Sequence, residues 1–150
     1  MRALDSAIAT YEARWGITQG ATEILPVCET ALALSTLGEM ARASARLRCA
    51  LLGAEDLAAD LCTIRAREAG ELDDARRRFL RQCRAAAIEP VDAPYTFNDA
   101  EGAVVEACRS RGLGCRTKSL VRTEHVAAVQ AAVMPSDQDL APSPRDRHRL

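Results

Sequence analysis

Two carboxylates in this sequence, Glu29 and Asp56, each follow a short apolar run and are the side chains best placed for chemistry. Glu29 stands in the segment LPVCET, and Asp56 stands 27 positions later in LLGAEDLAAD. That interval is about the length of one βα unit. Functional groups of parallel α/β folds gather where strands end, because the loops there vary without disturbing the core. We therefore expect Glu29 and Asp56 to end adjacent strands and to lie close together.

Two converging carboxylates repel one another and raise each other's pKa unless a cation lies between them. Magnesium favours hard oxygen ligands, takes one or two carboxylates from a protein, and keeps other positions for water and substrate oxygens. Glu29 and Asp56 are therefore candidate magnesium ligands. The residues alone leave an alternative, in which both acids lie at helix starts and contribute about 0.3–1 kcal/mol each. Glu55 and Asp60 also compete with Asp56 for the role of ligand.

Hydrophobic periodicity predicts strands that alternate with helices. Expected helices cover residues 3–15, 36–47, 72–87, 100–111 and 124–134, and expected strands cover 24–28, 48–52, 88–91 and 118–121, with a loop over 53–60. Such alternation indicates an α/β fold with parallel strands in one domain, residues 1–135. Residues 136–150 have no periodic apolar face, and we expect a disordered polar tail there.

Composition excludes several classes of partner. Twenty basic residues against 21 acidic ones leave a formal charge of −1, so no global field favours nucleic acid or anionic lipid. No apolar run approaches the roughly 20 residues of a spanning helix, and the start lacks a signal-peptide layout. The expectation is a cytoplasmic protein with no nucleic-acid or membrane partner. Six cysteines without a C-x-x-C pair are expected to be reduced and buried.

Three further expectations concern basic side chains. In the helix over 72–87, the apolar residues fall on one face and the arginines on the other, so Arg76 is expected in solvent. Arg65 and Arg67 are expected to be solvated as well. His125 falls on the last expected helix and is assigned to the surface.

Three motifs, in order, resemble the citrate lyase beta-subunit family of the 2,4-dihydroxyheptadioate aldolase/citrate lyase superfamily, which includes citryl-CoA and malyl-CoA lyases. The segment LPVCETALAL resembles the family's strand-end glutamate motif. The segment LLGAEDLAADL resembles its Gly-x-x-Asp-Leu signature, and VDAPYTFNDAEG resembles the strand and loop that follow. The resemblance covers residues 1–135 and corresponds to the C-terminal half of a family member.

The resemblance implies a fold, a site and a reaction. The fold would be a partial (β/α)8 TIM barrel, approximately strands five to eight with their helices. The metal-binding acids of the family carry over onto Glu29 and Asp56. The implied function is a magnesium-dependent carbon–carbon lyase, with manganese as an alternative metal. The substrate would be a CoA thioester such as citryl-CoA or malyl-CoA, cleaved in an aldolase-type reaction.

Departures from the family pattern leave other functions open. The arginine that grips the substrate carboxylate belongs to the first half of the family fold, and only Lys118 and apolar character survive from the last-strand motif Gly-Lys-x-x-Ile-His-Pro. Reduced activity is therefore expected. Two exposed sheet edges predict a homo-oligomer or a complementary half-barrel as partner. The alternatives are a non-catalytic remnant or assembly subunit of a split barrel, and an aldolase acting on a free keto acid.

Overall fold

A four-stranded parallel sheet is the centre of the computed structural model, which describes residues 1–67 and 70–135. Its strands pair in chain order: β1 (Val27–Cys28), β2 (Cys49–Leu52), β3 (Glu89–Tyr95) and β4 (Thr117–Leu120). The predicted α/β alternation is confirmed. The order does not reverse, whereas a doubly wound sheet reverses at its switch point. This order is the one expected of neighbouring strands in a barrel.

The helices also follow the predicted alternation, with two main differences: α2 starts earlier than expected, and one additional helix is present. They are α1 (Arg2–Trp15), α2 (Ala31–Ala43), α3 (Ala54–Asp60), α4 (Asp73–Ala85), α5 (Ala100–Leu113) and α6 (Val126–Val133). Helix α2 begins earlier than expected because the Thr30 side chain caps it, accepting from the Ala33 N–H at 3.0 Å. Residues 54–60 form α3 where a loop was predicted, because Ala54, Leu57 and Ala58 are buried on one face. None of the described helices is long and apolar enough to span a membrane.

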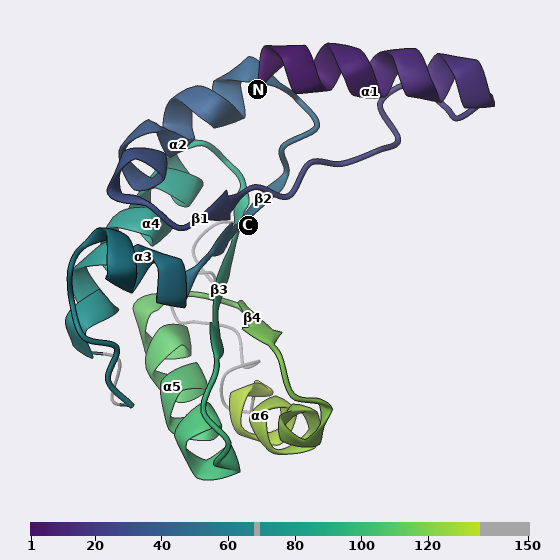
Figure 1. Ribbon diagram of the computed structural model, residues 1–150. Helices are drawn as coiled ribbons and strands as arrows, with labels where there is room; N and C mark the ends of the chain where they lie inside the picture. The colour runs from purple at the N-terminus through teal and green to yellow at the C-terminus, as the bar shows by residue number, and fades with distance from the viewer. Residues whose placement is uncertain (68–69, 136–150) are drawn as a thin grey trace, which may run out of the picture.

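The helices cover one face of the sheet. Cys28, Ala50 and Leu52 are fully buried and belong to one apolar cluster with Leu37 of α2 and Phe79 of α4. Figure 1 shows α2 to α5 together on that side, whereas no helix of the described residues covers the other side of the sheet between α1 and α6.

The sheet has two free edges within the described residues. Strand β1 pairs only with β2, and β4 pairs only with β3. On β1, Val27 points away from the core and is 44% exposed. The expected unpaired edges are therefore present in the described part of the chain.

Helix α1 extends away from the sheet (Figure 1). Apolar side chains of this helix are exposed: Leu4 and Tyr11 are largely accessible and Trp15 is 70% exposed. The buried residue of this helix is Glu12, whose two carboxylate oxygens each lie 2.6 Å from a guanidinium nitrogen of Arg46. A bidentate ion pair thus attaches α1 to the chain ahead of β2.

A network of buried charges joins the sheet to two helices. Asp92 of β3 lies 2.9 Å from Arg76 of α4 and 2.8 Å from Lys118 of β4. Glu106 of α5 lies 3.2 Å from Arg76 and 2.5 Å from Lys118. The expectation that Arg76 is solvated was wrong, since it is 2% exposed. Its partners are at distant positions in the chain, so helical periodicity could not reveal them.

The network keeps Asp92 and Arg76 ionised. Burial opposes the charge of Asp92, but the cations of Lys118 and Arg76 outweigh that effect and hold the pKa of Asp92 below its usual value. Burial likewise opposes the charge of Arg76, but the carboxylates of Asp92 and Glu106 raise its pKa overall. Each charge therefore depends on its partners for its presence in the core.

The loop after β3 is held from two sides. The Tyr95 hydroxyl lies 2.9 Å from Asp99, whose other oxygen caps α5 by accepting from the Gly102 N–H at 3.0 Å. His125 Nε2 lies 3.1 Å from the Asn98 carbonyl oxygen. The expectation of a surface histidine was wrong: His125 is 1% exposed, because a separate 3₁₀ turn, Thr123–His125, precedes α6 and turns it inward.

We predict that Gly102→Ala destabilises the fold. A Cβ at this position would overlap the Tyr95 hydroxyl and an Asp99 oxygen, so the buried tyrosine would have to move. Overpacking of this kind costs about 1–3 kcal/mol. Gly112→Ala, in the same helix but with open space around it, is the control and should gain up to about 1 kcal/mol from helix propensity. Urea unfolding measures both; equal stability of the two variants would contradict the packing argument.

We also predict that Asp92→Asn lowers the free energy of unfolding by about 3–5 kcal/mol at pH 7, because it removes one of the two carboxylates that compensate the buried cations of Arg76 and Lys118. The folded pKa of Asp92 is depressed, so its contribution is present above the unfolded value of about 3.9 and is lost as the pH falls below it. The difference in free energy of unfolding between Asp92→Asn and the wild-type chain should therefore become smaller below about pH 4.

The matched control for this prediction is Glu89→Gln on the same strand. Glu89 pairs with Arg84 at 3.2 Å, and both side chains are substantially exposed. The loss there should be about 1 kcal/mol or less. Chemical unfolding at several pH values compares the two variants. Similar losses of unfolding free energy at pH 7 would show that the buried network stabilises the fold no more than an exposed ion pair does.

Candidate metal centre

Glu29 lies directly after β1, across from Gly53. Cys28 pairs with Leu52, and the Gly53 N–H donates to the Cys28 carbonyl oxygen at 3.0 Å. A Cβ built on Gly53 would lie 2.9 Å from the Glu29 Cβ and 3.2 Å from its Oε2 atom. The Glu29 side chain therefore passes over Gly53, which is the N-cap residue of α3.

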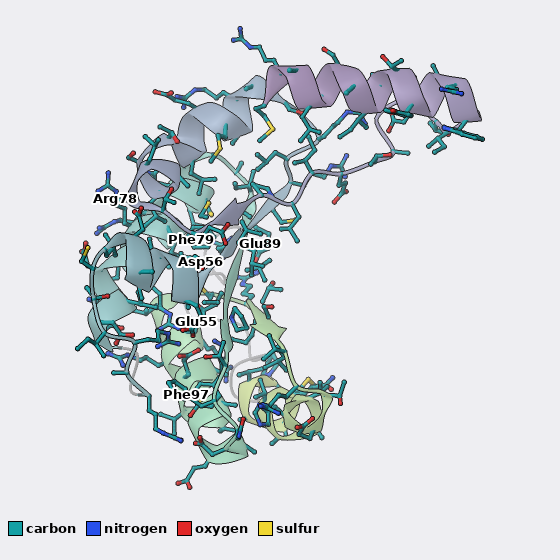
Figure 2. All side chains as sticks on the ribbon, viewed as in Figure 1. Glu55, Asp56, Arg78, Phe79, Glu89 and Phe97 are labelled. Carbon is teal, nitrogen blue, oxygen red and sulfur yellow. The ribbon has the colours of Figure 1, made fainter. Side chains whose placement is uncertain are left out.

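Asp56 lies in the first turn of that helix and is exposed. Figure 2 shows Asp56 and Glu55 at the end of α3 that follows β2. The helix-start alternative thus describes where Asp56 lies. It does not describe a capping role for Glu29, because Thr30 caps α2.

The two acids that compete with Asp56 are both occupied. Glu55 Oε1 accepts from the Thr96 hydroxyl at 2.6 Å and lies 3.2 Å from Arg65 Nε. Asp60 Oδ2 accepts from the Ala31 N–H at 2.8 Å. The side-chain carboxylates of Glu29 and Asp56, by contrast, make no hydrogen bond or ion pair with any residue in the described ranges.

Helical geometry relates Asp56 to the segment that carries Glu29. Asp56 and Asp60 are four residues apart in α3 and so share one face of the helix. Asp60 meets Ala31, two residues after Glu29. Asp56 lies one turn earlier on the face of α3 that Asp60 shares.

This arrangement suits magnesium. The described residues contain no group of three or more histidine, cysteine or acidic side chains able to hold a metal ion. A structural zinc site would need such a group. Two carboxylates are within the number that magnesium takes from proteins, and the remaining octahedral positions suit water and substrate oxygens.

The cysteines do not compete for this role. All six are free, and Cys28, Cys83 and Cys115 are buried, as expected, although Cys62 and Cys108 are exposed. Burial raises the pKa of the Cys28 thiol to about 11, and the negative charge of Glu29 adds to the shift. The thiolate is the form of cysteine that binds metals, so a protonated Cys28 does not compete with Glu29 for that role.

Two arginines that were expected in solvent border this region. Arg65 is largely buried and lies 3.0 Å from Glu71 and 3.4 Å from Glu106, besides its contact with Glu55. Arg67 pairs with Asp99, and its guanidinium lies 5.0 Å from the Phe97 ring. The sequence contained no local signal for the contacts of Arg65, because Glu106 is 41 positions away.

Comparison with known proteins gives relatives of matching sequence. The family model described as HpcH/HpaI aldolase/citrate lyase matches residues 1–123. The citrate lyase subunit beta of Haemophilus influenzae is 34% identical over 143 residues, covering 95% of this chain and 49% of the relative. An L-malyl-CoA/beta-methylmalyl-CoA lyase of Rhodobacter capsulatus is 28% identical over 157 residues, covering 93% of this chain and 49% of that enzyme. The chain thus spans about half the length of these relatives.

Solved structures with a similar fold include proteins of the same kind. A citrate lyase from Burkholderia xenovorans superposes with a TM-score of 0.79 at 20% identity, over 91% of this chain and 45% of that one. The CitE protein of Mycobacterium tuberculosis, in complex with magnesium, acetoacetate and coenzyme A, superposes with a TM-score of 0.68 at 25% identity, over 79% of this chain and 46% of that one. The 150-residue chain belongs to the HpcH/HpaI aldolase/citrate lyase family.

Proposed function

We propose that this chain provides the metal-binding half of a magnesium-dependent carbon–carbon lyase that acts on a CoA thioester. Glu29 and Asp56 are the proposed metal ligands. The observation that carries the proposal is a pair of carboxylates without a side-chain partner among the described residues. Glu29 directly follows β1 and Asp56 lies in the first turn of the helix that follows the neighbouring strand β2, in a chain 34% identical to a citrate lyase subunit beta. Manganese is an alternative metal on the same oxygen ligands.

The chemistry divides between the ion and the protein. Magnesium supplies Lewis-acid polarisation of a substrate carbonyl oxygen and stabilises the negative charge that develops as the carbon–carbon bond breaks. Glu29 and Asp56 would hold and orient the ion and need not transfer protons. The exposure of Asp56 leaves the substrate side of the site open to solvent and to a bound thioester.

The CoA thioester class is supported by the names of the relatives. One is an L-malyl-CoA/beta-methylmalyl-CoA lyase, and the Mycobacterium tuberculosis neighbour was solved with coenzyme A. An aldolase acting on a free keto acid is the alternative within the family. The segment GAEDLAADL favours the citrate lyase branch. A cytoplasmic location stays a prediction from composition.

We further propose that the four strands are approximately strands five to eight of a (β/α)8 barrel. Three observations support this: the strands pair in chain order, helices cover one face, and within the described residues the opposite face has no covering helix and the sheet has two free edges. A complementary half-barrel, or a second copy of this chain, would pair with those edges. If the chain binds no metal, the open face favours the alternative role of an assembly subunit.

We predict that magnesium chloride raises the melting temperature of the chain, because a ligand that binds only the folded state stabilises it. At one hundred times the dissociation constant the gain is about 2.7 kcal/mol, or roughly 5–10 °C for a domain of this size. Glu29→Gln and Asp56→Asn should each abolish the shift. Asp74→Asn is the matched control, since Asp74 is likewise an exposed acid in the first turn of a helix, α4. A full magnesium response in either ligand variant would refute the assignment.

We also predict that the isolated chain cleaves citryl-CoA and malyl-CoA at most very weakly and associates with itself. Metal polarisation is only part of catalysis, and positioning of the substrate contributes up to roughly 7–11 kcal/mol in well-oriented systems. The open sheet face and the exposed Val27 on edge strand β1 favour association. Light scattering after gel filtration, run beside a thioester cleavage assay, tests both statements. A monodisperse monomer with a turnover of about 1–10³ per second would contradict them.

A further inference from the structure

We infer that Asp60 and Glu55 are positioning residues that hold α3 at both ends and so set the spacing between Glu29 and Asp56. The consequence for metal binding rests on the proposed function. The restraint itself concerns only the chain and can be tested without metal.

Helix α3 needs such restraint because it is short. It has seven residues, and isolated helices of this length are not stable in water. Its N-cap residue, Gly53, has no side chain to satisfy the first N–H groups. Buried Ala54, Leu57 and Ala58 fix the depth of the helix against the core. They do not by themselves fix its two ends.

Asp60 restrains the C-terminal end of α3. Its Oδ2 atom accepts from the Ala31 N–H at 2.8 Å. Ala31 is the first residue of α2, and its N–H is one of those that a helix start leaves without an internal partner. Thr30 satisfies the Ala33 N–H of the same turn. One hydrogen bond therefore joins the helix that carries Asp56 to the turn that begins at Glu29.

Glu55 restrains the N-terminal end. Its Oε1 atom accepts from the Thr96 hydroxyl, which follows β3, and also contacts Arg65. Arg65 is itself held by Glu71 and by the buried Glu106. Glu55 thus connects the first turn of α3 to the end of β3 and to the core.

The two contacts fix different properties of Asp56. Successive residues in a helix point about 100° apart, so the contact of Glu55 with Thr96 determines the direction of its neighbour Asp56. The contact of Asp60 with Ala31 determines how far the shared face of α3 lies from the Glu29 turn. Magnesium demands near-ideal octahedral geometry, and loss of residues that orient ligands typically costs 10–100-fold in metal affinity.

The experiment measures magnesium chloride binding to the full chain by calorimetry at 25 °C, with circular dichroism to verify folding. Asp60→Ala should weaken magnesium binding by roughly 10–100-fold. Asp60→Asn retains an oxygen acceptor for the Ala31 N–H and should bind magnesium close to wild type. Glu55→Ala should also weaken binding, and Glu55→Gln, which retains an acceptor for the Thr96 hydroxyl, should restore most of the affinity. Asp74→Ala, at an exposed helix start elsewhere, should have no effect.

Two results would overturn the inference when the wild-type chain binds magnesium. Unchanged affinity in both Asp60→Ala and Glu55→Ala would show that neither restrains the site. Equal losses in Asp60→Asn and Asp60→Ala would show that the charge of Asp60 matters directly, as for a ligand.

A second measurement decides the restraint if the wild-type chain does not respond to magnesium, a result that would refute the proposed function alone. Amide hydrogen exchange in the metal-free chain should be faster across Ala54–Asp60 and at Ala31 in Asp60→Ala, and normal in Asp60→Asn. Unchanged exchange in Asp60→Ala would overturn the inference without reference to any metal.

Discussion

The pairing of β1 with β2 is the interaction on which the carboxyl edge of this sheet depends. Strand β1 has only two residues, yet its register brings Cys28 against Leu52 and so places Glu29 over Gly53. Any side chain at position 53 would displace Glu29, because a Cβ there already lies within 3.0 Å of two neighbouring side chains. The same glycine is the N-cap residue of α3. The pairing of β1 with β2, the start of α3 and the position of the Glu29 side chain therefore all depend on Gly53.

Charged residues near this edge fall into two groups with different surroundings. Asp92, Glu106, Arg76 and Lys118 lie between the sheet and its helices, where each has an opposite charge within hydrogen-bonding distance. Glu29 directly follows β1, Asp56 lies in the first turn of α3, and neither side chain has such a partner among the described residues. Buried charges need compensation to remain ionised, whereas the proposed metal ligands would need to be left without a protein partner in order to bind a cation. The first group therefore contributes to the stability of the fold, and the second group leaves two carboxylates available.

Much of the fold could be predicted from the sequence, because apolar periodicity reports which face of each element is buried. It predicted the helices over 3–15 and 72–87 and the alternation of strands with helices. Helix α1 ends at Gly16, which adopts the left-handed conformation that glycine accommodates readily. It failed for residues 54–60, where a seven-residue helix is too short to show a period. It also failed for Arg76 and His125, which are buried by partners far away in sequence or by a local 3₁₀ turn.

The candidate site shows the same limit at the level of single residues. Spacing alone identified Glu29 and a cluster of three acids, Glu55, Asp56 and Asp60, but it contained nothing to rank the three. Their hydrogen-bond partners distinguish them, and those partners, Thr96 and Ala31, belong to other βα units. An acid that is held by its neighbours orients the backbone, and an acid that is left free can accept a cation. Local sequence specifies which residues can carry charge near a strand end, while the contacts between units decide which of those charges remains available to a metal.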